Sequence, residues 1–327
     1  MRARASLFEA VGLGLLASLF FAFTFVLNRR MDLGGGNWTW SASLRFMFML
    51  PMLAALLVPR GGLGKLLRDM RHRPGPWLLW GTVGFGFFYA PLCLASTLGP
   101  SWLVAASWQL TIVAGALLTP LSRVPRRRER RQAGGAAGGN RGLGSSLPLR
   151  AILFSLVILA GVGLLQLRGP GTGARQGSLL LVLLVVIAAF AYPLGNRRMM
   201  GYCEGRLTTL ERVFGMTLGS MPFWLILAGF GLASAGPPSP SQLFQTFLVA
   251  LFSGIVATLL FFKATDLVHG DMHRLAAVES TQSGEVVFSL LGGVFVFGDA
   301  IPTTLGFVGL ALVVAGMLLN SLFHART

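Results

Sequence analysis

Charged residues are scarce in this sequence. Only 12% of its 327 residues are Asp, Glu, Lys or Arg, whereas a typical soluble domain has about 25%. Acidic residues are the scarcer kind, with 11 Asp and Glu against 27 Lys and Arg. A chain in which 54% of the residues are hydrophobic has too little polar surface for a water-soluble fold. The composition therefore predicts a membrane protein.

Cysteine and histidine are almost absent as well. The two cysteines, Cys93 and Cys203, are too few for a disulfide framework, and neither has a ligand-type neighbour in the sequence. His269 and His273 flank Asp271 at a spacing that a metal ion accepts, but no further ligand lies nearby. We therefore predict neither a metal nor a cofactor.

Long apolar runs fill most of the chain. Each is close to the roughly 20 residues that a helix needs to cross a bilayer, and Gly- and Pro-rich stretches separate the runs. The predicted fold is an all-α polytopic membrane protein with ten transmembrane helices. The predicted spans are 8–28, 38–58, 77–97, 102–122, 150–167, 177–196, 209–232, 241–262, 275–297 and 303–323.

Lys and Arg gather in alternate connections between these spans. Twenty-one lie on the side that carries both termini and four on the other, while Arg45 and Arg212 fall inside spans. Because positive residues favour the cytoplasmic side, we predict that both termini are cytoplasmic. The same distribution accounts for the net charge of +16 without nucleic-acid binding, for which no motif is present. The basic loop 123–149 is predicted to be a flexible cytoplasmic connection.

Three short segments of the first half of the chain have counterparts in the second half, in the same order and at nearly the same offset in residue number. They pair 28–31 (Asn-Arg-Arg-Met) with 196–199 at an offset of 168, Arg45 with Arg212 at 167, and 107–109 (Ser-Trp-Gln) with 280–282 (Ser-Thr-Gln) at 173. The first repeat comprises 1–149, which holds helices 1–4 and the basic loop, and helix 5 at 150–167. The second repeat, 168–327, holds helices 6–10. Because each repeat has five spans, an odd number, the second repeat enters the membrane from the opposite side. Inverted repeats allow two halves to exchange conformations around one central site, which favours a transporter.

Several segments resemble a known family. They are 21–45 (FAFTFVLNRRMDLGGGNWTWSASLR), Gly284-Glu285, Gly298-Asp299, Gly306 to Gly309 and Ala315-Gly316. Together with the five-plus-five plan, they resemble the drug/metabolite transporter superfamily, and within it the ten-helix bacterial branch of multidrug resistance efflux transporters, which is related to EamA-like carriers. The resemblance covers essentially the whole chain. It implies a central cavity lined mainly by spans 1–4 and 6–9, and export or exchange of small organic molecules, often driven by protons.

One departure from the family concerns the proton-binding acid. Small four-helix relatives carry an essential glutamate within the first span, whereas span 1 of this chain has only Glu9, close to its cytoplasmic start. Span 9 is the better place for such a group, because Glu279, Gln282, Glu285 and Ser289 fall within an arc of about 120° on a helix.

Glu285 lies about 15 Å into span 9 at 1.5 Å per residue. A charge at that depth costs at least about 2.5 kcal/mol unless it is paired, hydrated or protonated. We predict Glu285 as the proton-coupling residue, together with Glu279 nearer the cytoplasmic side. The alternatives are a buried acid that only ties helices together and a solvated charge at the helix start.

A second set of polar and aromatic residues is predicted to line a substrate cavity. Gln282 and Gln109 would face each other across the repeat axis; the alternative is that they form hydrogen bonds between neighbouring helices. Arg45 and Arg212 would act as counter-ions or gates; the alternative is that they extend to lipid headgroups. Aromatic side chains would supply a wall for planar or cationic ligands. The predicted cavity residues are Gln282, Gln109, Trp108, Ser107, Tyr89, Arg45 and Arg212, and Trp102, Phe20, Phe21 and Tyr192 are further candidates for the aromatic wall.

The sequence thus predicts a secondary transporter in the bacterial cytoplasmic membrane. Its partners would be a small-molecule solute, the proton and the lipid bilayer, and a homodimer stays an open alternative. Export by proton exchange is the favoured mode. Two alternatives remain: an enzyme acting on a lipid-linked substrate, with 269–274 as its candidate cluster, and a sensor or assembly subunit. The charge of the substrate is open, because acids favour cations, arginines favour anions, and both are present.

Overall fold

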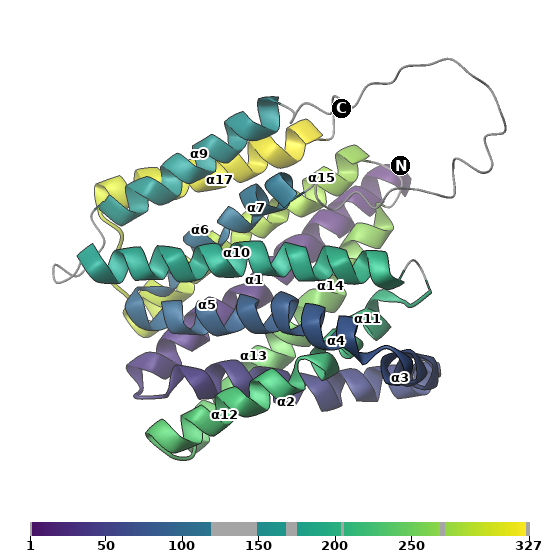
Figure 1. The fold of residues 1–327 in the computed structure, drawn as a ribbon. Coiled ribbons are helices and arrows are strands. Elements are labelled where there is room, and N and C mark those ends of the chain that lie inside the picture. Colours follow the sequence, from purple (N-terminus) through teal and green to yellow (C-terminus); the bar gives the residue numbers. More distant parts are fainter. Residues whose placement is uncertain (1, 119–148, 168–174, 204–205, 269–271, 325–327) are drawn as a thin grey trace.

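The computed structural model describes residues 2–118, 149–167, 175–203, 206–268 and 272–324. Every regular element in these ranges is helical, and the helices lie side by side in one bundle (Figure 1). The predicted basic loop 123–149 falls almost wholly outside the described residues. The described parts of the ten predicted spans are helical except at Gln109 and Ser220, which are turns, and at Thr303, just before α17.

In the first half, several predicted spans consist of more than one helical segment. A capping bond from the Thr39 backbone amide to the Asn37 side chain starts α2, as expected for an asparagine N-cap. The segments are α1 (Arg2–Leu33), α2 (Trp38–Leu57), the 3₁₀ turn η1 (Val58–Arg60), α3 (Leu63–His72), α4 (Pro74–Gly81), the π-helix η2 (Thr82–Gly86), α5 (Phe87–Leu98), α6 (Ser101–Trp108), α7 (Leu110–Leu118) and α9 (Leu149–Leu167).

The second half is interrupted in a similar way. A capping box between Thr208 and Glu211 starts α11, and the chain bends by 43° between α11 and α12. The segments are α10 (Arg175–Cys203), α11 (Thr209–Gly219), α12 (Met221–Ala235), α13 (Pro240–Val249), the π-helix η4 (Ala250–Val256), α14 (Ala257–Leu267), α15 (Met272–Ser280), the 3₁₀ turn η5 (Thr281–Ser283), α16 (Gly284–Leu291), the π-helix η6 (Gly292–Val296) and α17 (Thr304–His324).

Five of the described helices are long and apolar enough to cross a membrane, and the bent pair α11–α12 would make six. The five are Leu7–Leu33, Trp38–Arg60, Pro74–Leu98, Leu179–Cys203 and Pro240–Leu267. Two shorter apolar helices, Leu156–Leu165 and Thr304–Leu319, accompany them. The chain is therefore a multi-pass membrane protein, while the ten-span plan and the inverted repeat stay predictions.

Helix α1 packs against segments of both halves, among them α5, α6, α14 and α16, and it runs through the bundle in Figure 1. Helices α9 and α17 form an extensive pair along one side. Glycines allow this pair to approach closely, because a Cβ on Gly161 would lie 2.8 Å from the Gly309 carbonyl oxygen. Small residues at such contacts are typical of helices in membranes.

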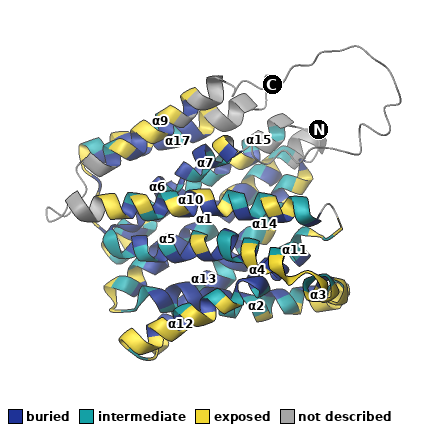
Figure 2. Cartoon of the chain, viewed as in Figure 1, coloured by how far each residue is buried: buried dark blue, intermediate teal, exposed yellow. Residues whose placement is uncertain are grey.

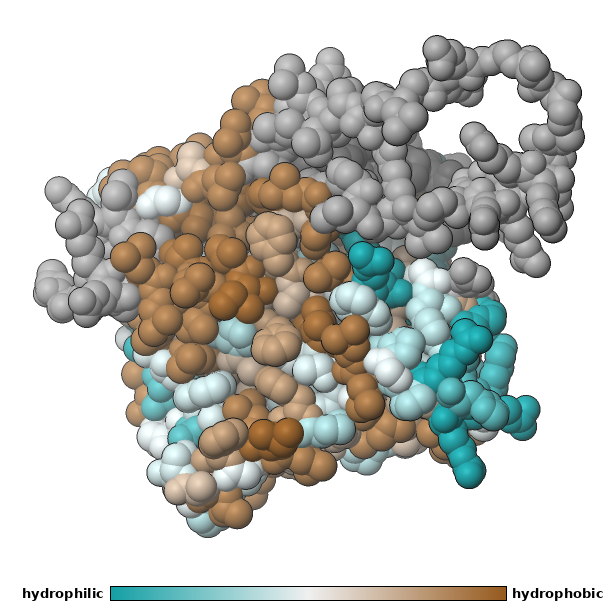
Figure 3. All heavy atoms as spheres, viewed as in Figure 1, coloured by the Kyte–Doolittle hydropathy of each residue, from teal (hydrophilic) through white to brown (hydrophobic). Residues whose placement is uncertain are grey.

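Large apolar side chains face outward over much of the surface. Phe295 is 80% exposed and Leu179 is 71% exposed, and exposed residues follow the outer faces of the helices in Figure 2. Figure 3 shows hydrophobic side chains over most of the visible face and a hydrophilic cluster at the end where α3 lies. An exposed apolar surface of this kind is expected where lipid replaces water.

Candidate functional site

A cavity of about 570 Å³ lies inside the bundle. Most of its wall is apolar, and α17 adds one residue to it, Met317, whereas α9 adds none. This lining agrees with the arrangement that the family resemblance implies. We call it the central cavity; its polar and charged lining residues are Thr24, Arg45, Gln109, Thr111, Asn196, Arg212, Ser253, Thr258, Glu279, Gln282 and Glu285.

The structure brings seven of the nine predicted site residues together in this cavity. They are Glu279, Glu285, Gln282, Gln109, Trp108, Arg45 and Arg212. Their roles in substrate binding and proton coupling stay predictions. Glu9, the acid of the first span, is exposed and lies outside the described lining.

Tyr89 and Ser107, the other two predicted cavity residues, are fully buried and do not line the cavity. Tyr89 instead lies behind Arg45, whose guanidinium carbon is 4.2 Å from the centre of the tyrosine ring. The Tyr89 hydroxyl is within hydrogen-bond distance of both side-chain polar atoms of Asn28, at 3.1 and 3.3 Å. Tyr89 therefore supports the cavity wall rather than forming it.

Two further expectations about the aromatic wall differ from the structure. Trp102 and Phe20 do not line the cavity, whereas Phe21, Tyr192 and Trp108 do. The indole nitrogen of Trp102 donates to the Ala300 carbonyl at 2.8 Å, so this ring fastens two segments at the end of the bundle.

Arg45 on α2 is held by neutral groups. Its two terminal nitrogens donate to the Thr24 hydroxyl at 3.2 Å and to the Ser253 hydroxyl at 3.1 Å, and these hydroxyls are 2.6 Å apart. Its Nε is buried without a hydrogen-bond partner. Sequence reasoning missed Thr24 and Ser253, although a hydroxyl inside an apolar span is a usable signal.

Glu285 at the start of α16 is 6% exposed, and its hydrogen-bond partner is Gln109. Gln109 lies between α6 and α7 and also donates to the Ala105 carbonyl at 3.1 Å. Gln282 lies in the 3₁₀ turn η5, and its Nε2 is buried without a partner. Both amides of the predicted repeat therefore lie where an α-helix is interrupted.

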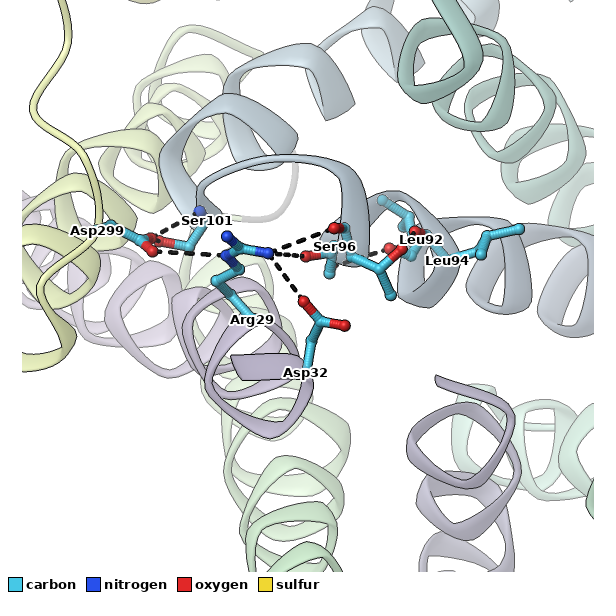
Figure 4. A network of polar contacts seen from close by, with 8 residues as sticks. Arg29, Asp32, Leu92, Leu94, Ser96, Ser101 and Asp299 are labelled. Carbon is cyan, nitrogen blue, oxygen red and sulfur yellow. Dashed lines mark hydrogen bonds and ion pairs between the residues drawn. The ribbon is translucent and has the colours of Figure 1, made fainter. Parts of the chain in front are cut away.

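A polar network joins α1 to the start of α6 (Figure 4), and α6 lies at the end of the bundle away from α3 (Figure 1). The Asp299 carboxylate accepts hydrogen bonds from the Ser101 backbone amide at 2.8 Å and from its hydroxyl at 2.6 Å. Arg29 at the end of α1 approaches Asp299 at 3.7 Å and donates to Asp32 at 2.9 Å and to the Ser96 carbonyl at 3.3 Å. Asp299 therefore links α1 and α6 to the segment that follows η6.

A second polar cluster anchors α3 at the basic end. Asp69 accepts hydrogen bonds from Trp77 Nε1 and the Tyr202 hydroxyl, both at 3.0 Å, and pairs with Arg206 at 3.1 Å. Burial favours a higher pKa for Asp69, but the hydrogen bonds from Trp77, Tyr202 and Arg206 outweigh it and hold the pKa below its usual value. The charged carboxylate therefore ties α3 to α4 and α10.

A multi-pass helical chain that encloses a cavity with buried charges has the architecture of a membrane carrier for small solutes. A family model described as "EmrE: Putative multidrug resistance efflux transporter" matches residues 8–326. The chain belongs to this family of drug/metabolite transporters.

Two curated relatives match most of the chain. "Uncharacterized protein YjlA" of Bacillus subtilis (strain 168) is 50% identical over 313 residues, which cover 96% of this chain and 94% of that protein. "Uncharacterized 42.1 kDa protein in intracellular alkaline protease 3'region" of Shouchella clausii is 45% identical over 282 residues, covering 86% and 71%. One solved crystal structure superposes with a TM-score of 0.61 at 17% identity and covers 97% of this chain and 98% of that chain, a likeness of fold alone.

Proposed function

We propose that the protein is a secondary transporter that moves small organic solutes across the bacterial cytoplasmic membrane by alternating access, with export coupled to protons. The observation that carries this proposal is the central cavity, which gathers charged residues from both halves of the chain inside an apolar bundle. Buried charges in a membrane protein are costly, so they are retained for solute or ion binding.

Alternating access is supported by the difference between the two ends of the bundle. The network of Arg29, Ser101 and Asp299 closes the end that carries few positive residues, whereas the cavity lining reaches Arg212 and Glu279 near the basic connections. We assign this arrangement to the inward-facing state, with both termini in the cytoplasm.

The helix interruptions support the inverted repeat. The π-helices η2 and η4 begin at Thr82 and Ala250, which is the offset of 168 that separates the two Asn-Arg-Arg-Met segments. Interruptions of this kind inside spanning helices often lie at functional sites. Two halves with matched flexible points are suited to exchanging conformations.

Glu285 is the proposed proton-binding group. It lies in the cavity wall, and no ion pair found among the described residues involves it. Because Gln109 is a neutral partner, Glu285 is free to exchange its proton when the cavity changes sides. The cluster 269–274, the candidate for the enzyme alternative, falls partly outside the described residues, because 269–271 are not described.

Proteoliposome transport tests the coupling role. The probes are indole-3-acetate, tryptamine and tetraphenylphosphonium, each followed as a radiolabelled solute under an imposed pH gradient. We expect Glu285→Gln to reduce pH-driven transport by about tenfold or more, while solute exchange without a gradient continues. Glu9→Gln is the matched control and should behave as the unaltered protein does. Undiminished pH-driven transport by Glu285→Gln would exclude Glu285 as the coupling residue.

A further inference from the structure

Resting on the proposed function, we infer that the central cavity takes an organic anion, with an acidic group paired to Arg45 and an apolar ring against the aromatic wall. Arg45 is 7% exposed and its guanidinium is always charged. No ion pair found among the described residues involves it. A buried charge without a counter-charge is unfavourable, so an anionic ligand beside Arg45 would stabilise it.

Arg45 lines the cavity and is held in place by its neighbours. Thr24 and Ser253 accept hydrogen bonds from its terminal nitrogens and Tyr89 covers one face of the guanidinium, so the group is fixed in place before a ligand arrives. Its Nε is buried and has no hydrogen-bond partner, so the polar contacts of the guanidinium are incomplete. A preorganised arginine of this kind suits a carboxylate or phosphate group.

The buried acid of the cavity does not supply this counter-charge, because Glu285 is bonded to the neutral amide of Gln109. The second arginine of the cavity, Arg212, also has a buried Nε without a hydrogen-bond partner. Three residues of the cavity lining, Arg45, Arg212 and Gln282, thus each have a buried donor without a hydrogen-bond partner, and a cationic ligand would offer none of these donors an acceptor.

An aromatic wall stands beside the arginine. Phe88, Trp108 and Tyr192 all line the cavity, with ring centres 5.0 Å apart for Phe88 and Trp108 and 4.9 Å for Phe88 and Tyr192. Phe88 also contacts Tyr89, the ring that covers Arg45. The acidic group and the ring of one small molecule would therefore be bound side by side.

Calorimetry on the detergent-purified full chain tests this inference with matched ligands. Indole-3-acetate carries the anion, indole-3-acetamide is the neutral analogue, tryptamine is the cation, and indoxyl phosphate distinguishes a phosphate from a carboxylate. We expect either anion to bind at least about tenfold more tightly than the amide, and tryptamine to bind weakest. Arg45→Gln should abolish this preference, whereas Arg30→Gln, at an exposed arginine over Phe297 outside the cavity, should preserve it.

Tighter binding of tryptamine than of both anions would overturn the inference, and so would an unchanged preference in Arg45→Gln. If that variant does not fold, Arg45→Lys and the ranking of the four ligands on the unaltered protein decide. Transport of tetraphenylphosphonium without binding of either anion would refute the anion site and leave the proposed function standing. Absence of any solute flux would refute the proposed function itself.

Discussion

If the proposed inward-facing assignment holds, replacing Asp299 with alanine is expected to open the end of the bundle that faces outward. The Asp299 carboxylate binds the backbone amide and the hydroxyl of Ser101 at 2.8 and 2.6 Å and faces Arg29. These contacts join segments from both halves of the chain. Their removal should therefore favour the state in which this end is open.

The expected size of the effect depends on the two kinds of contact. A hydrogen bond to a charged group contributes about 1.5–3 kcal/mol, and the two bonds from Ser101 are short and buried. The Arg29 contact is weaker, because its Nε lies 3.7 Å from Asp299 and makes no hydrogen bond. A loss of about 3 kcal/mol in total raises the outward-facing population relative to the inward-facing one by about 150-fold.

Thiol labelling from outside the cell measures this shift. Leu92 lines the cavity on α5, so Leu92→Cys reports access to the cavity once Cys93 and Cys203 have been changed to alanine. A membrane-impermeant maleimide should label this position much faster when Asp299→Ala is added. Asp299→Asn, which keeps an oxygen acceptor but loses the charge, should give an intermediate rate.

Asp32→Asn is the matched control. Asp32 also pairs with Arg29, at 2.9 Å, but the two residues belong to the same helix and Asp32 is 27% exposed. This variant should leave the labelling rate nearly unchanged, since the pair joins no separate helices. Equal labelling of Asp299→Ala and the unaltered protein would refute the assignment of an outer gate.

Two further predictions concern stability. Asp69→Asn should lower the free energy of unfolding by about 1–3 kcal/mol at neutral pH. Because the pKa of Asp69 is held below its usual value, the extra stability of the unaltered protein is present above about pH 4 and is lost as the pH falls below that value. Thermal denaturation of both proteins across this pH range measures the difference. Gly161→Leu should separate α9 from α17 and lower the melting temperature, because even a Cβ would lie 2.8 Å from the Gly309 carbonyl oxygen. Gly163→Leu is the control, because nothing lies within 4 Å of a Cβ at that position. Equal melting temperatures of the two variants would contradict this prediction.

Hydropathy and charge predicted the helical membrane class, and helical periodicity placed Glu279 and Glu285 on one face. Residue type and the repeat match selected Tyr89 and Ser107 for the cavity, but both are fully buried and do not line it. Tyr89 comes after the π-helix η2. Because a π-helix inserts an extra residue into a turn, the face of a later residue does not follow from counting along the helix.

The contacts that hold Arg45 could not be predicted from the sequence, for another reason. Arg45 and Ser253 are 208 residues apart, and no local pattern indicates which hydroxyl of one half meets which residue of the other. The polar residues themselves were visible as interruptions of apolar runs. Their partners depend on how the helices pack, which composition and spacing do not encode.

The distribution of symmetric and asymmetric residues suggests a division of roles inside the cavity. At the predicted repeat offset of 167, Arg45 corresponds to Arg212, so an exchange of conformations would present an arginine to an anion in both states. Glu285 has no such counterpart, because Ile112 stands at its position in the first half. The arginines would thus hold the solute while one helix senses the proton, and Glu285→Gln should change the pH dependence of transport without changing the preference for anions.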